Sequence, residues 1–134
     1  MKISEIFLLT ILFASTAQVK AQITEPITVV KGQLEAYNKQ NIEAFLNCYS
    51  EGVEVYNFPN ELIYKGKDKM REKYTNAWMQ NPKQKAEVTD RISVGNTVID
   101  KEHVTGRATG IEANVIAIYK IEKGKINQVY FIRE

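Results

Sequence analysis

Three side chains that can move protons lie close together between residues 100 and 103: Asp100, Glu102 and His103. Successive side chains of a strand point to opposite faces, so Asp100 and Glu102 share one face if this segment is a strand. If that face is buried, desolvation and mutual repulsion raise the pKa of one carboxyl and make it an acid/base group. If it meets solvent, the two are ordinary surface charges, which the general exposure of charged residues favours.

His103 lies on the opposite face of the same predicted strand. Its imidazole titrates near neutral pH and could serve as a general base, although an exposed or interfacial histidine is the alternative. A bulge in the strand would exchange the two faces and bring His103 inside instead. The candidate catalytic residues from the sequence are therefore Glu102, His103 and Asp100.

An amide, Asn57, ends a short alternating segment just before Pro59. An amide is no base at neutral pH, but it can donate to and accept from the carbonyl or hydroxyl of a ligand. The alternative is that it satisfies backbone groups near the turn, as Asn side chains often do.

Aromatic side chains are expected to form the walls of a cavity for a small apolar molecule, since they combine an apolar body with a polar edge. With Asn57, the candidate ligand-binding residues are Phe58, Trp78, Tyr119 and Phe131. Large side chains of this kind could instead fill the cavity themselves.

The chain holds one cysteine and one histidine. One of each cannot supply the usual ligands of a zinc site, and a single cysteine cannot form an internal disulfide, so no metal or other cofactor is expected. Cys48 lies in an apolar helical pattern and is interpreted as a small buried hydrophobe.

The first 21 residues have the pattern of a signal peptide: Lys2, an apolar run over 6–14, and small residues before a polar exit at Ala21. Cleavage after Ala17 is an alternative, as is a retained anchor or first helix. The apolar run is shorter than the roughly 20 residues that span a bilayer, so no stable membrane insertion is expected. A secreted or periplasmic protein with one domain over 22–134 follows.

Removal of residues 1–21 leaves 16 basic and 15 acidic side chains, a net charge of about +1. No basic stripe is interleaved with aromatics, so the composition does not favour nucleic-acid binding. The basic residues over 65–73 alternate with Asp68 and Glu72 and are interpreted as the solvated face of a helix.

Hydrophobic periodicity predicts an α+β domain with helices on one face of a curved sheet. A helix is expected over 26–39, a second from Asn41 to a stop at Gly52, and a third over 67–80. A short strand over 53–58 precedes the third helix, and four antiparallel strands follow it: 85–94, 97–107, 111–122 and 125–133.

Both faces of the predicted strand 111–122 are apolar. Ala117 and Tyr119 share one face, whereas Ile116 and Ile118 share the other. The helices of the domain can cover only one face, so a homodimer is expected to cover the second.

Three segments carry a resemblance to a known family: VVKGQLEAYNKQNIEAFLNCYSEGVEVY, YKGKDKMREKY and GKINQVYFIRE. They resemble the SnoaL-like proteins of the nuclear transport factor 2 and ketosteroid isomerase superfamily. The resemblance implies a conical, cystatin-like α+β barrel in which three N-terminal helices pack on a curved, mostly antiparallel sheet. It also implies a mostly apolar cavity and dimerisation through the convex face.

The catalytic residues of the steroid isomerases do not carry over in this comparison. The general-base aspartate falls at Asn57, the oxyanion-hole tyrosine at Gln33 and the oxyanion-hole carboxylic acid at Ala117. The leading interpretation is therefore an exported domain whose apolar cavity binds a small organic molecule. A proton-transfer enzyme (isomerase, cyclase or dehydratase) with a different acid/base residue, and a dimerisation or accessory module with a filled cavity, are the alternatives.

Overall fold

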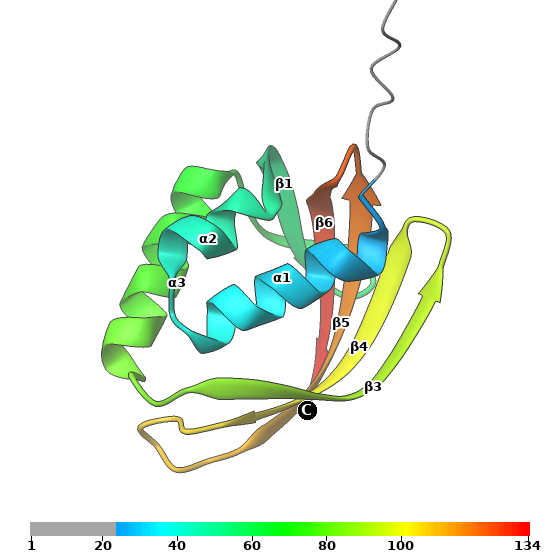
Figure 1. Cartoon of the computed structure of the whole chain (residues 1–134). Coiled ribbons are helices and arrows are strands. Elements are labelled where there is room, and N and C mark those ends of the chain that lie inside the picture. Colours follow the sequence, from blue (N-terminus) through cyan, green and yellow to red (C-terminus); the bar gives the residue numbers. More distant parts are fainter. Residues whose placement is uncertain (1–23) are drawn as a thin grey trace, which may run out of the picture.

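A curled, six-stranded sheet wraps around the helices, which lie on its concave side (Figure 1). The computed structural model describes residues 24–134, so the expected signal peptide lies outside the described residues. The elements in chain order are α1 (Pro26–Asn38), α2 (Ile42–Asn47), β1 (Tyr49–Asn57), β2 (Glu61–Lys65), α3 (Lys67–Gln80), β3 (Lys85–Val94), β4 (Thr97–Thr105), β5 (Ala113–Glu122) and β6 (Lys125–Arg133).

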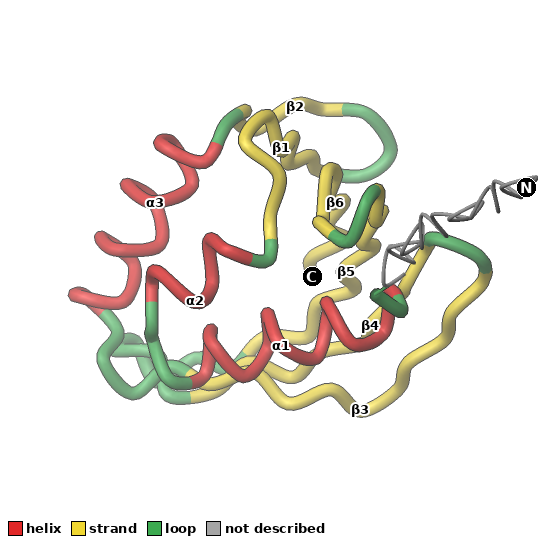
Figure 2. The backbone as a smooth tube through the Cα atoms, turned by 45° about the horizontal axis from the view of Figure 1, so that its top comes forward, coloured by secondary structure: helices red, strands yellow, loops and turns green. Residues whose placement is uncertain are grey.

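The strand order across the sheet is β2-β1-β6-β5-β4-β3, and only the β1–β6 pair is parallel. Figure 2 shows the strand at one edge, β3, curling beneath α1 while α2 and α3 lie beside it. The expected α+β architecture is therefore confirmed, as an open, curled sheet.

The N-terminal elements follow local sequence signals. Pro26 occupies the first turn of α1, where its missing N–H costs nothing. Asn41 caps α2, because its side chain accepts a hydrogen bond from the Ala44 backbone N–H at 3.1 Å. No helix in the described range 24–134 is long and apolar enough to cross a membrane.

Two expectations for this half were wrong. α2 ends at Asn47 rather than at Gly52, and Gly52 lies within β1, because the chain enters the sheet at Tyr49. Residues after Pro59 return as β2, an edge strand that the sequence pattern did not predict. β2 is mostly exposed, so it lacks the alternation of apolar and polar residues that identifies a half-buried strand.

A β-bulge in β3 resets which of its side chains face the interior. Val88 pairs with Glu102 but Asp90 pairs with Lys101, so Thr89 is an extra residue in β3. After the bulge Arg91, rather than Asp90, lies on the inner face opposite Asp100. The charge of Asp90 is thereby placed in solvent.

Arg91 and Asp100 form a two-pronged ion pair on the inner face. Arg91 Nε and Nη2 lie 2.6 and 2.7 Å from the two carboxylate oxygens. The Asp100 side chain is 1% exposed, so its charge is compensated by the guanidinium rather than by water.

Replacement of Arg91 by methionine is expected to destabilise the fold by about 3–5 kcal/mol, because it leaves a buried carboxylate without its cation. The double variant Arg91→Met/Asp100→Val is expected to recover most of that loss, since neither charge is then buried. Urea unfolding at pH 7 measures both. Lys31→Met, at an exposed position of α1, is the control and should change stability by less than about 0.5 kcal/mol. Equal stability of Arg91→Met and the wild type contradicts the prediction.

Candidate functional site

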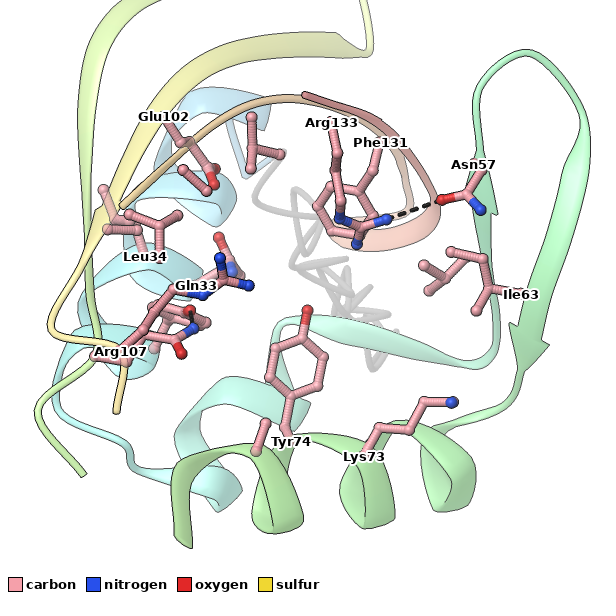
Figure 3. A pocket seen from close by; sticks show the side chains of 18 of the residues that line it. Gln33, Leu34, Asn57, Ile63, Lys73, Tyr74, Glu102, Arg107, Phe131 and Arg133 are labelled. Atoms are coloured by element: carbon pink, nitrogen blue, oxygen red, sulfur yellow. Dashed lines mark hydrogen bonds between the residues drawn. The ribbon is translucent and has the colours of Figure 1, made fainter. Parts of the chain in front are cut away.

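A cavity of about 520 Å³ lies between the helices and the concave face of the sheet. α1 contributes Gln33, Leu34 and Tyr37 to its lining, and α3 contributes Lys73, Tyr74 and Ala77. The remaining lining comes from the inner faces of the strands, from the loop after β4, and from Gln84 before β3 and Glu134 after β6 (Figure 3). A volume of this size accommodates a small organic molecule.

Glu102 is a carboxyl group in the wall of this cavity. It is 8% exposed, and the Tyr119 hydroxyl donates a hydrogen bond to its Oε1 at 2.9 Å. Burial raises the pKa of Glu102 to about 7; nearby Asp100 adds to this rise, whereas the Tyr119 hydrogen bond and Arg91 oppose it. The carboxyl can therefore both accept and release a proton near neutral pH.

Asp100 and Glu102 face the interior together, so the interpretation of the pair as surface charges was wrong. They differ in accessibility, since Glu102 lines the cavity whereas Asp100 is fully buried and does not. Asp100 is also engaged by Arg91 through both oxygens. Of the two carboxyl groups, only Glu102 is placed to reach a ligand.

His103 lies on the outer face of β4, away from the cavity. Its Nδ1 is 3.1 Å from Asn114 Oδ1, and its Nε2 is 2.8 Å from Glu112 Oε2. A bulge within β4 would have turned His103 inward, but β4 alternates without interruption from Thr97 to Thr105. The extra residue of this strand pair lies in β3 instead. The structure thus separates His103 from Glu102.

Asn57 lines the cavity and holds an arginine. Its Oδ1 accepts a hydrogen bond from Arg133 Nη1 at 2.8 Å (Figure 3). Its Nδ2 donates to Glu61 Oε2 at 3.3 Å. The partners of the amide are thus side chains, rather than the backbone of the Pro59 turn. Asn57 is placed to orient the Arg133 guanidinium.

Of the four aromatic candidates, the structure places Tyr119 and Phe131 on the cavity wall. Phe58 lies beyond the end of β1 and is 53% exposed. Trp78 is buried between the helices against Tyr37, at a centroid distance of 5.8 Å, and does not line the cavity. Helical periodicity identified Trp78 as buried, but it could not distinguish the helical core from the cavity wall.

Three cations also line the cavity: Lys73, Arg107 and Arg133. Sequence reasoning missed them: Lys73 belongs to the run 65–73 that was interpreted as a solvated helix face, and neither arginine was among the candidate site residues. One signal was available for Arg133, which follows Phe131 by two residues and therefore shares its face of β6. With these cations the lining is mixed, rather than mostly apolar.

Two further polar groups face the cavity from α1. Gln33 is buried, and its Oε1 has no hydrogen-bond partner. The Tyr37 hydroxyl accepts a hydrogen bond from Gln84 Nε2, so its own hydrogen is left for another acceptor. Within residues 24–134, no group of three or more His, Cys, Asp or Glu side chains could hold a metal ion.

The raised pKa of Glu102 makes a prediction about stability. In the unfolded chain its pKa is near 4.5, so between about pH 4.5 and 7 the folded state holds the proton more tightly. Stability therefore falls as pH rises through this window, by about 3 kcal/mol in all. Glu102→Gln removes this titration, and its stability relative to the wild type is expected to rise by about that amount between pH 4.5 and 8.

Urea unfolding at several pH values across the window measures this difference. Glu122→Gln, an exposed carboxylate at the end of β5, is the matched control and should leave the wild-type pH dependence unchanged. Parallel stability curves for Glu102→Gln and the wild type would show that Glu102 titrates normally.

Comparison with known proteins places this geometry in a family. A family model described as a SnoaL-like domain matches residues 30–129, while no curated protein matches. An uncharacterised cystatin-fold protein from Novosphingobium aromaticivorans is 27% identical, with 82% of this chain and 99% of that chain covered at a TM-score of 0.76.

Two further solved structures share the fold at lower identity. An NTF2-like protein of unknown function from Cytophaga hutchinsonii is 19% identical, with 82% and 90% of the two chains covered at a TM-score of 0.69. IdmH, a proposed polyketide cyclase from Streptomyces antibioticus, is 14% identical, with 83% and 93% covered at 0.70. The chain belongs to the SnoaL-like domain family.

Proposed function

We propose that this protein is a proton-transfer enzyme that acts on a small organic molecule in the cavity, with Glu102 as its general base. One observation carries the proposal: a carboxyl group is buried in the cavity wall with one oxygen held by Tyr119. Its pKa of about 7 is suited to proton transfer at neutral pH. Solved relatives described as proposed polyketide cyclases and a ketosteroid isomerase support this reaction class.

The reaction begins with removal of a proton from a carbon next to a carbonyl. Tyr119 fixes one oxygen of Glu102, and the other oxygen takes the proton as the carbon–hydrogen electron pair moves toward the carbonyl oxygen. The Tyr37 hydroxyl, whose hydrogen is not used in its bond with Gln84, donates to the developing oxyanion. Return of the proton to a second carbon completes an isomerisation. In a cyclisation the enolate carbon attacks another carbonyl, and the proton held by Glu102 passes to the new alkoxide.

Binding without turnover is the second candidate. It is favoured by the three residues that stand where the steroid isomerases have their catalytic groups. Of these, Gln33 and Asn57 line the cavity and Ala117 is buried in β5. None of the three can act as an acid or a base, so proton abstraction in this cavity requires Glu102 as a base at a different position.

Proton exchange tests the enzymatic proposal. The α-protons of enolisable ketones and β-keto esters, 2-tetralone among them, are followed by proton NMR in D₂O. The wild-type protein is expected to accelerate exchange, with a rate that rises with pH through about 7, since the base must be ionised. Glu102→Gln should lower the rate by roughly 10²–10⁴-fold.

Glu112→Gln provides the matched control, because it makes the same change on the outer face of the sheet. It should leave the exchange rate unchanged. A wild-type protein that accelerates no member of the panel, or a Glu102→Gln variant that retains the rate, contradicts the proposal.

We also propose that the protein is exported, from the pattern of residues 1–21, and that two copies pair through the outer face of the sheet. Register supports the pairing: Tyr56, Tyr130, Ile118, Ile99 and Ile92 form one row across five neighbouring strands. Beside this row Ile132 is 43% exposed.

Sedimentation equilibrium tests the pairing. The wild-type chain is expected to behave as a dimer, and Ile132→Glu as a monomer, because the substitution buries a charge in the interface. A monomeric wild-type protein contradicts it.

A further inference from the structure

We propose that the ligand of this cavity is a small organic carboxylate, whose charged group binds at Arg133, while Lys73 and Arg107 add positive charge to the same cavity. Its apolar body lies over Val115, and its reactive end lies at Glu102. The inference deepens the proposed function and rests on it for the reactive end alone. The binding of the carboxylate is argued from the cations themselves.

Arg133 is held in one orientation by two contacts. Its guanidinium carbon lies 4.3 Å from the centroid of the Phe131 ring, and its Nη1 donates to Asn57. Among residues 24–134 it forms no ion pair, so its remaining N–H groups are available to a ligand (Figure 3). A planar guanidinium matches the two oxygens of a carboxylate, and its fixed orientation lowers the entropy cost of binding.

Lys73 differs from its basic neighbours on α3. Lys69 pairs with Glu72 and Arg71 pairs with Glu43, whereas Lys73 has no acidic partner in the described part of the chain. Its ammonium instead lies 5.4 Å from the centroid of the Tyr64 ring, a residue of the cavity lining. The helix therefore directs one uncompensated positive charge to the cavity.

The backbone fixes the loop that carries Arg107. Gly106 has a φ of 74°, and a Cβ at this position would overlap the Lys83 carbonyl oxygen, so only glycine fits. Asn81 Oδ1 accepts a hydrogen bond from the Ala108 backbone N–H at 2.9 Å. Arg107 is thus placed at the cavity by an ordered turn, and it too has no ion-pair partner among the described residues.

The acidic groups of the lining do not neutralise these cations. The Glu134 carboxylate accepts a hydrogen bond from Asn114 Nδ2 at 3.1 Å, and Asn114 belongs to the outer face. Glu102 is engaged by Tyr119. Three positive charges from three separate elements therefore converge on one cavity, which favours an anionic ligand over a neutral one.

Sheet register gives the length of that ligand. Arg133 pairs with Val115, which pairs with Glu102, so the cation and the carboxyl lie on one inner row across β6, β5 and β4. Two strand spacings separate their backbones by about 10 Å.

A matched pair of probes tests the inference. Isothermal titration calorimetry compares 2-naphthylacetate with 2-naphthylacetamide, which has the same rings but no charge, at pH 7.5 and low salt. The wild-type protein is expected to bind the carboxylate at least about 10-fold more tightly. The triple variant Arg133→Gln/Lys73→Gln/Arg107→Gln should lose that preference while it retains its affinity for the amide. Circular dichroism checks that it is folded.

Lys101→Gln, an exposed cation on the outer face of β4, is the control for net charge and should keep the preference. Equal affinities for the two probes, no binding of 2-naphthylacetate, or a preference that survives in the triple variant overturns the inference. Tighter binding of 2-naphthyl phosphate that depends on the same three residues also overturns it, in favour of a phosphate ligand.

Glu102→Gln separates this inference from the proposed function, since it should abolish proton exchange and leave the preference for the carboxylate intact. A preference for the carboxylate without any exchange activity contradicts the proposed function alone. Exchange activity without that preference contradicts the present inference alone.

Discussion

Two carboxyl groups on one buried face of β4 impose the constraint on which the rest of this structure depends. Asp100 and Glu102 are two residues apart, and their burial leaves little solvent contact to offset their repulsion. The two carboxyl groups have different partners: Asp100 forms an ion pair with Arg91, whereas Glu102 accepts a hydrogen bond from the Tyr119 hydroxyl and has a raised pKa. Neutralising both with cations would have removed the group that can exchange a proton.

The bulge in β3 makes this division possible. If β3 alternated regularly through Thr89, Asp90 would lie on the inner face and Arg91 would point toward solvent. A third acidic side chain would then face Asp100 with no guanidinium nearby. A local irregularity in an edge strand thus determines the electrostatics of the cavity wall, as bulges beside functional sites often do.

Much of this arrangement could be predicted from local patterns, and the exceptions have physical reasons. The alternation of β4 and β5 predicted correctly which of their residues share a face, because one buried face requires period 2. Whether that face of β4 was buried could not be decided, since its charged residues matched a surface strand equally well. The bulge and β2 depend on pairing with distant strands, and the Asn57–Arg133 hydrogen bond joins residues 76 apart in the chain.

The polar groups of the cavity are costly for the fold, and their placement bears on function. Desolvation of Glu102 costs about 3 kcal/mol above neutral pH, and Gln33 leaves a buried oxygen without a partner. If these two positions served only to pack the helices against the sheet, a leucine at either one would avoid that cost. Both groups instead face the same cavity as three uncompensated cations. Polar and charged side chains that cost folding stability and line the same cavity are expected where a ligand supplies their missing partners.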